Sequence, residues 1–120
     1  IIRLDFVLVL APFYYLGQTL SFLIAYYEHL GADPDDPSAT GVSTYEPIYN
    51  FLFLNNGYHN EHHYRPHQHW SRMKSVKREL GSEDRGGRRR VTAWPHPLGF
   101  LDPQTYRVPT AAAQGAGHPD

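Results

Sequence analysis

The hydrophobic pattern of the chain is dominated by one uninterrupted apolar run near its start. From Phe6 to Tyr27 the sequence FVLVLAPFYYLGQTLSFLIAYY contains no charged residue. As a helix these 22 residues would extend roughly 33 Å, enough to cross a hydrocarbon layer of about 30 Å. We therefore expect a transmembrane helix over about 6–27.

The alternative is a buried helix of a soluble protein, favoured by Gln18 and by Pro12, which would kink or interrupt the span. The polar remainder of the chain could hardly cover such a helix on all sides.

Beyond this run the pattern predicts shorter elements. The acidic, proline-containing segment EHLGADPDDPSATGVSTYEP is typical of a loop that leaves a membrane. A second apolar run, IYNFLFLNNGYHNEHH, is too short to span a bilayer and predicts an amphipathic or surface-lying helix. Pro66 disfavours helical angles at Arg65, so this helix is expected to end near Tyr64. The segment RMKSVKREL predicts a further helix that stops at Gly81.

Together these elements predict an all-α fold, an integral membrane helical fragment with a histidine-rich helical region on the cytoplasmic side. Residues 1–80 would form the membrane domain. Residues 81–120 are poor in apolar side chains and would be an irregular tail, disordered or loosely attached. The chain has no initiator Met and begins almost at once with the apolar run, so we expect it to be the C-terminal part of a longer protein.

Charge is segregated along the chain, although the formal net charge is only −1. Nine of the eleven Lys and Arg residues lie between Arg65 and Arg90, a distribution that suits the cytoplasmic face of a membrane. The chain has no cysteine, which excludes disulfides, thiolate metal sites and a cysteine nucleophile. A bound metal would therefore need nitrogen or oxygen ligands.

Five of the eight histidines fall within residues 55–70. His59, His62 and His63 stand at i, i+3 and i+4, so on a helix they would share one face and could converge on one metal ion. Neutral imidazole suits Fe, Zn, Cu and Ni. The zinc-protease motif H-E-x-x-H needs a Glu directly after the first His, and its inverse H-x-x-E-H needs one directly before the second. Glu61 is two positions after His59 and would face the opposite side of the helix, so neither motif fits. The zinc-deaminase motif fails because its cysteines are absent.

Polar residues near this cluster allow more than one role. Asn55 and Asn56 precede His59 by about one helical turn and could orient a ligand, hold a metal-bound water or cap the histidine helix. His67 and His69 follow Pro66 and are expected to be surface groups or neighbours of ligands rather than ligands.

The segment NNGYHNEHH resembles the third histidine box, H-x-x-H-H, of the membrane fatty acid desaturase and hydroxylase superfamily. An apolar helix that ends in a histidine thirty residues before this box is also similar to acyl-CoA desaturases. The resemblance covers roughly residues 10–72. It implies a multi-span membrane enzyme with a cytoplasmic cap and a histidine-rich, non-haem diiron centre that activates dioxygen to attack an unactivated C–H bond.

By this resemblance His59, His62 and His63 would be iron ligands, with no catalytic residue beyond the metal ligands. His29 would match an extra ligand at the end of the last membrane helix. Taken alone, His29 is more typical of a polar residue at a membrane interface, so its assignment depends on the resemblance. In acyl-CoA desaturases an asparagine stands four residues before that extra histidine, where this chain has Ala25, so a water-mediated contact would be lost or replaced. The first two histidine boxes are absent from this chain and are expected upstream.

The implied function is a desaturase that introduces a double bond into a fatty acyl or lipid chain. It would use O2 and electrons from a protein of the ferredoxin, rubredoxin or cytochrome b5 type, with no nucleic-acid partner. A hydroxylase with the same diiron centre is one alternative. A non-enzymatic, membrane-anchored segment that binds metal or senses pH is the other. Upstream histidine boxes would favour an enzyme over such a segment.

Overall fold

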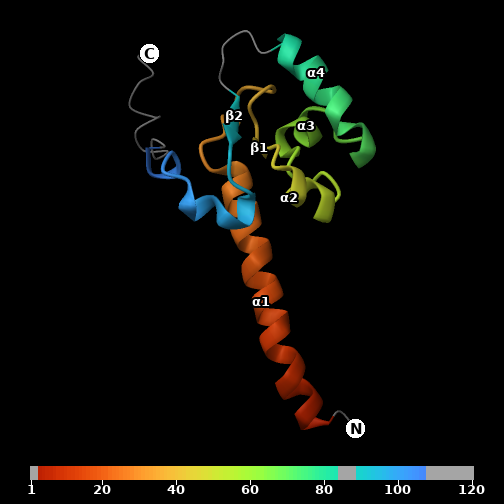
Figure 1. Cartoon of the computed structure of the whole chain (residues 1–120), viewed down its shortest axis with the longest axis vertical. Helices are drawn as coiled ribbons and strands as arrows, with labels where there is room; N and C mark the ends of the chain where they lie inside the picture. The colour runs from red at the N-terminus through yellow and green to blue at the C-terminus, as the bar shows by residue number, and fades with distance from the viewer. Residues whose placement is uncertain (1–2, 84–88, 108–120) are drawn as a thin grey trace.

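The computed structural model describes residues 3–83 and 89–107 (Figure 1). Its longest element is α1 (Leu4–His29), which projects away from the rest of the molecule. The helix runs without interruption through Pro12 and exceeds the expected range of 6–27 at both ends. Among the described residues it is the one helix long and apolar enough to cross a membrane, and its most apolar stretch has no buried residue. The apolar side chains of this stretch are therefore available for contact with lipid.

The single surface helix expected before the histidines is two short helices instead. These are α2 (Pro47–Leu52) and α3 (His59–Tyr64). The turn between them contains Leu54 and Asn55 in the left-handed region, with φ of 50° and 64°. Such angles end a right-handed helix, and Asn adopts them more readily than most residues. The end of α3 at Tyr64 confirms the boundary predicted from Pro66.

A small parallel sheet makes the fold mostly helical rather than all-α. β1 (Val42–Thr44) pairs with β2 (Arg90–Thr92), with Val42 opposite Arg90. β1 is fully buried and contacts both α1 and α3. Strands of three residues are too short to display the alternating pattern by which a strand is predicted, which is why the sequence did not reveal them.

On the other side of α3, η1 (Trp70–Arg72) leads into α4 (Met73–Glu83). The predicted helix over RMKSVKREL is confirmed, although it continues two residues beyond Gly81. A small apolar core joins α3 to α4 and consists of Tyr58, Met73 and Val76, with Tyr45 and Tyr64 packed against it. Thus α3, the helix that carries the histidine box, is held between β1 and α4.

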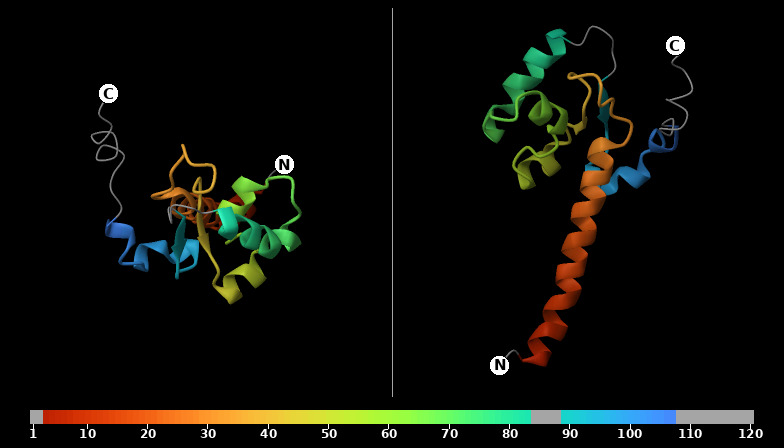
Figure 2. Two further views of the ribbon diagram at one scale, coloured as in Figure 1. Left: turned by 90° about the horizontal axis from the view of Figure 1, so that it is seen from above. Right: turned by 180° about the vertical axis from the view of Figure 1, so that it is seen from behind.

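Residues 89–107 differ from the loose tail expected over 81–120. After β2 the chain forms η2 (His96–Leu101) and η3 (Thr105–Arg107), and η2 lies beside the end of α1 (Figure 2). Gly99 packs so closely on the Tyr27 ring that a Cβ would be 2.4 Å from Tyr27 Cγ. A few specific contacts of this kind order the segment without many apolar side chains. The part of the expected tail over 108–120 lies outside the described residues.

Candidate metal centre

Three histidines from two helices meet where α1 ends. His59 and His63 lie four residues apart on α3 and face His29 in the last turn of α1. The Nε2 atom of His59 lies 3.2 Å from Nε2 of His29 and 3.0 Å from Nε2 of His63. One ligand nitrogen from each of the three residues lies within 4.8 Å of the other two. We refer to His29, His59 and His63 as the histidine trio.

The spacing of the trio fits a shared metal ion. Bonds between zinc and imidazole are about 2.0–2.1 Å long, so two imidazole nitrogens adjacent in one coordination shell lie roughly 3.0–3.4 Å apart. Both Nε2 distances from His59 fall within this range. The same distances suit a hydrogen bond between two neutral rings, which would keep the trio together before an ion binds. The donor set is entirely nitrogen, one of the two donor types expected of a chain without cysteine.

His62 does not join the trio. Its ring centroid lies 6.2 Å from that of His63, and its side chain is exposed. Successive residues of a helix turn by about 100°, so His62 and His63 diverge although each lies near His59 in projection. The three box histidines therefore do not all converge as predicted. His59 and His63 belong to the trio, and His62 lies apart from it. His67 and His69 are exposed and also lie outside the trio.

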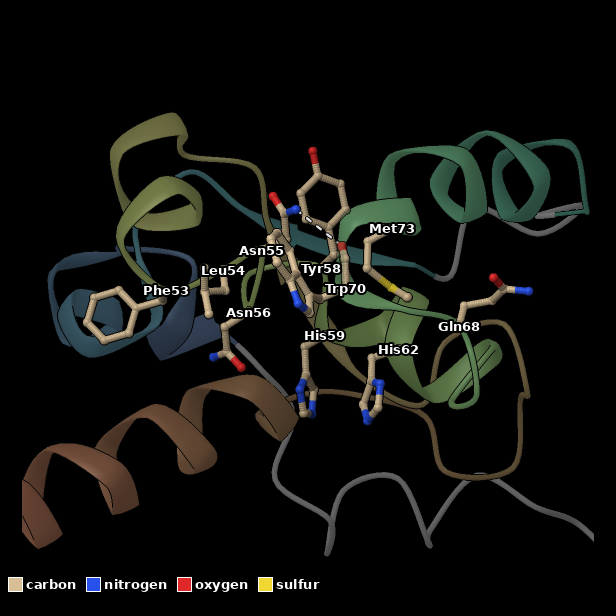
Figure 3. A pocket seen from close by; sticks show the side chains of 10 residues that line it. All are labelled: Phe53, Leu54, Asn55, Asn56, Tyr58, His59, His62, Gln68, Trp70 and Met73. Atoms are coloured by element: carbon tan, nitrogen blue, oxygen red, sulfur yellow. Dashed lines mark hydrogen bonds between the residues drawn. The ribbon is translucent and has the colours of Figure 1, made fainter.

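A cavity of about 360 Å³ opens beside the box, with His59 and His62 on one wall. Figure 3 shows both imidazoles projecting from α3 in the same direction. The remaining lining is largely apolar and aromatic and consists of Phe53, Leu54, Asn55, Asn56, Tyr58, Gln68, Trp70 and Met73. A cavity lined in this way can accept an apolar chain next to imidazole groups.

Asn60, which lies within the box, attaches α3 to the preceding loop. Its side chain is buried, with 1% of the residue exposed. The Asn60 Oδ1 atom accepts a hydrogen bond from the Gly41 N–H at 3.0 Å, and its Nδ2 donates to the Ser38 carbonyl at 2.7 Å. The orientation of the box histidines therefore depends on a loop about twenty residues earlier in the chain.

Glu61 attaches the same helix to β1 and to the residue before β2. Its carboxylate accepts hydrogen bonds from the hydroxyls of Ser43 and Tyr45, both at 2.6 Å, and from Arg89 at 2.9 Å. Burial and the Glu61 carboxylate raise the pKa of Tyr45 above its ordinary range, so Tyr45 stays a neutral donor. The prediction that Glu61 faces away from the histidines is confirmed, and its role is to hold the helix.

A buried carboxylate behind the trio was not predicted from the sequence. The Glu28 Oε2 atom lies 3.6 Å from His59 Nδ1, and Glu28 Oε1 lies 3.4 Å from Nδ1 of His96. Glu28 and His96 are 6% and 0% exposed. From the sequence, Glu28 next to His29 could either accept a hydrogen bond from an imidazole or mark the water interface, and its burial and its partners come from the structure. No local pattern marks His96, because its partner is distant in the chain and its segment was expected to be loose.

The two asparagines before the box occupy different places. Asn56 Nδ2 donates a hydrogen bond to Glu28 Oε1 at 2.7 Å. Asn55 Nδ2 donates to the Trp70 carbonyl at 3.2 Å. The residue that precedes α3 makes no side-chain cap, so neither asparagine caps the histidine helix. Asn56 therefore contacts the carboxylate behind the trio, whereas Asn55 connects the turn to η1.

The surroundings of the trio favour neutral imidazole. Burial lowers the pKa of His59 from 6.5 to about 4, opposed by the Glu28 carboxylate and assisted by His63 and His29. Burial also lowers the pKa of His63, again assisted by His29. Metal coordination needs the unprotonated nitrogen, so both rings are in a form that can bind an ion at neutral pH.

These features define a mostly helical protein in which a long apolar helix ends at a cluster of imidazoles able to hold a metal ion. The chain belongs to the fatty acid desaturase family, since the family model described as Fatty acid desaturase matches residues 2–94. This confirms the family indicated by the histidine box. No curated protein and no solved structure matches the chain. Members of this family are in general membrane-bound oxidoreductases that use a diiron centre, a lipid substrate, dioxygen and an electron donor.

Proposed function

We propose that this chain contributes a membrane span and the third histidine box to a non-haem diiron desaturase that introduces a double bond into a fatty acyl or lipid chain. The observation that carries the proposal is the meeting of His29 with His59 and His63 at the end of α1. A helix that only anchored the chain would have no need to present an imidazole to the box.

The proposed ligands are the histidine trio and His62. The trio would hold iron through nitrogens that already lie at the spacing of a coordination shell. His62 diverges from the trio but lines the same cavity as His59, and it would be a fourth histidine that this chain gives to the diiron centre. When bound, the iron pair would supply the activation of dioxygen and the removal of hydrogen from a methylene group.

The remaining residues would position the centre and shield it. Asn60 and Glu61 hold α3 through buried hydrogen bonds, so the imidazoles do not need to reorganise when a metal binds. The apolar lining of the cavity, with Phe53 and Trp70, would accept part of the acyl chain and exclude water. Desaturation removes two hydrogen atoms from the acyl chain. With two further electrons and two protons, these hydrogens reduce dioxygen to two molecules of water.

In this proposal α1 spans the bilayer and the histidine box faces the cytoplasm. The exposed apolar side chains of α1 would contact lipid. The basic residues that follow the box would lie near anionic headgroups, where positive charge is favoured; these are Arg65, Arg72, Lys74, Lys77 and Arg78. Electrons would come from a separate protein of the ferredoxin, rubredoxin or cytochrome b5 type.

Product analysis of the full-length protein tests this function. Membranes that contain the protein should convert saturated acyl chains to products lighter by two hydrogen atoms, and His59→Ala should abolish the conversion. The matched control is His67→Ala, which removes an exposed histidine outside the trio and should leave conversion unchanged. Products heavier by one oxygen atom would identify a hydroxylase instead. Full conversion by the His59→Ala variant would contradict the proposed site.

A further inference from the structure

The Glu28 carboxylate lies between two imidazoles from distant parts of the chain. Its Oε2 atom is 3.6 Å from His59 Nδ1, and its Oε1 atom is 3.4 Å from His96 Nδ1. We propose that Glu28 and His96 form a positioning pair, in which Glu28 orients the His59 ring toward the metal and His96 holds Glu28. This inference rests on the proposed function, because it requires His59 to be a metal ligand.

The two ring nitrogens of His59 face different partners. Its Nε2 faces the other two members of the trio, whereas its Nδ1 faces Glu28. Histidines that bind metals almost always present their second nitrogen to a carboxylate, a carbonyl or water, which fixes the tautomer and the ring orientation. A proton on Nδ1, directed at Glu28, leaves the lone pair of Nε2 free for the metal. Glu28 is placed to select that tautomer.

The burial of Glu28 makes its own partners important. Only 8% of its side chain is exposed, and an ionised carboxylate removed from water is costly unless it is paired. Within residues 3–83 and 89–107 its closest charged or imidazole neighbours are His59 and His96, and Asn56 donates a hydrogen bond to it. No Lys or Arg of this part of the chain pairs with it. With His59 directed at the metal, His96 is the remaining imidazole whose ring nitrogen faces the Glu28 carboxylate.

His96 is held in place by tight packing. The side chain is fully buried, and its ring stands edge-on to Tyr49 with the centroids 5.8 Å apart. Three residues later, Gly99 lies against the ring of Tyr27, the residue before Glu28. Figures 1 and 2 both show η2 beside the end of α1. This packing brings His96 to the carboxylate and allows little movement away from it.

The buried nitrogens of His96 also indicate a role beyond packing. Within the described residues neither ring nitrogen makes a hydrogen bond, and Nδ1 has only the 3.4 Å contact with Glu28. Buried polar atoms without hydrogen bonds are rare, because each costs free energy relative to water. An apolar side chain would fill the same space without that cost. His96 also lies just beyond the range matched by the family model, so the family match does not account for it.

The experiment is a titration of the full-length protein, purified in detergent and stripped of metal, with Co²⁺ alone. The readouts are the dissociation constant and the visible absorption bands of bound Co²⁺, which respond to ligand geometry. Glu28→Gln should weaken binding about tenfold or more, since loss of the group that orients a metal-ligating histidine typically costs about 10–100-fold in affinity. It should also shift the absorption bands. His67→Gln, the matched surface control, should leave both readouts at the wild-type values.

A double-mutant cycle separates His96 from a merely structural residue. His96→Gln should also weaken Co²⁺ binding, and the Glu28→Gln/His96→Gln double variant should be no weaker than Glu28→Gln alone, because His96 acts through the carboxylate. If Glu28→Gln unfolds, Glu28→Asp takes its place in the single and the double variant, and if His96→Gln unfolds, His96→Asn does. The Glu28→Asp variant keeps the charge but withdraws it by one methylene group. Its affinity for Co²⁺ should be lower than that of the wild type, by less than tenfold.

Wild-type protein that binds Co²⁺, together with folded variants that match it in both readouts, would overturn the positioning pair and leave the proposed function standing. Losses that simply add in the double variant would overturn the role of His96 as a residue acting through Glu28. Wild-type protein that binds no Co²⁺ at all would instead refute the proposed metal centre.

Discussion

At the scale of single residues, the two side chains between the box histidines hold α3 in place through buried contacts. Asn60 and Glu61 stand where the motif H-x-x-H-H places no requirement, yet both are almost completely buried. Glu61 forms an ion pair with Arg89 in which the two side chains are 0% and 11% exposed. Removal of one partner of such a pair leaves a buried charge that water cannot reach.

Glu61→Ala should therefore lower the free energy of unfolding by about 3–5 kcal/mol, because it leaves Arg89 without its buried carboxylate. The matched control is Glu79→Ala, which removes a carboxylate from an exposed ion pair with Arg65 and should cost at most about 1 kcal/mol. Denaturant unfolding of both variants provides the comparison. Equal losses in the two variants would show that the buried pair does not hold α3.

The sequence predicted the side of the helix on which Glu61 lies, but not its partners. Two residues along a helix correspond to a rotation of about 200°, which turns Glu61 away from His59. Ser43 and Arg89 approach Glu61 only because the chain folds back, and no local pattern encodes such contacts. The same limit explains why His29 needed the family resemblance to be considered a ligand, and why His96 was not considered at all.

At the scale of elements, the turn between α2 and α3 sets the position of the box. The Gly57 carbonyl accepts a hydrogen bond from the Thr44 N–H, and its own N–H donates to the Asn50 side chain. A Cβ on Gly57 would be 2.4 Å from the Thr44 carbonyl oxygen and 2.8 Å from atoms of the Asn50 amide. Real side chains do not approach a backbone oxygen so closely, so only glycine fits here.

Gly57→Ala should destabilise the protein by about 1–3 kcal/mol or more, because either the turn or β1 must move to admit the methyl group. Gly17→Ala is the matched control, since a Cβ there meets nothing within 4 Å. In mid-helix this change should be neutral or stabilising by up to about 1 kcal/mol. The midpoints of thermal unfolding in detergent give the comparison. A Gly57→Ala variant as stable as Gly17→Ala would contradict the close packing of this turn.

The elements that could be predicted are those whose signal lies within one segment. α1 follows from a long run without charge, and α4 from RMKSVKREL. The break between α2 and α3 depends on the positive φ angles of Leu54 and Asn55. These angles could not be predicted, because both residues lie in or next to an apolar run. β1 and β2 exist because two three-residue segments, far apart in the chain, lie side by side.

At the scale of the whole molecule, a long exposed helix carries a compact region at one end, and the histidine trio lies where the two meet (Figure 1). The contacts of η2 with α1 and of α3 with β1 bring separate parts of the described chain together around this junction. We infer that this junction holds one metal ion of the diiron centre, shared by the two helices. Of the histidine trio only His29 comes from α1, so its replacement tests whether the two helices share the ion.

Iron analysis of the full-length protein tests whether α1 and α3 share a metal ion. Purified wild-type protein should contain tightly bound iron, and His29→Ala and His63→Ala should each lower the iron content, because each removes one nitrogen from the same ion. His67→Ala should retain the wild-type content. Wild-type protein without iron, or a His29→Ala variant with undiminished iron, would contradict a metal ion shared between α1 and α3.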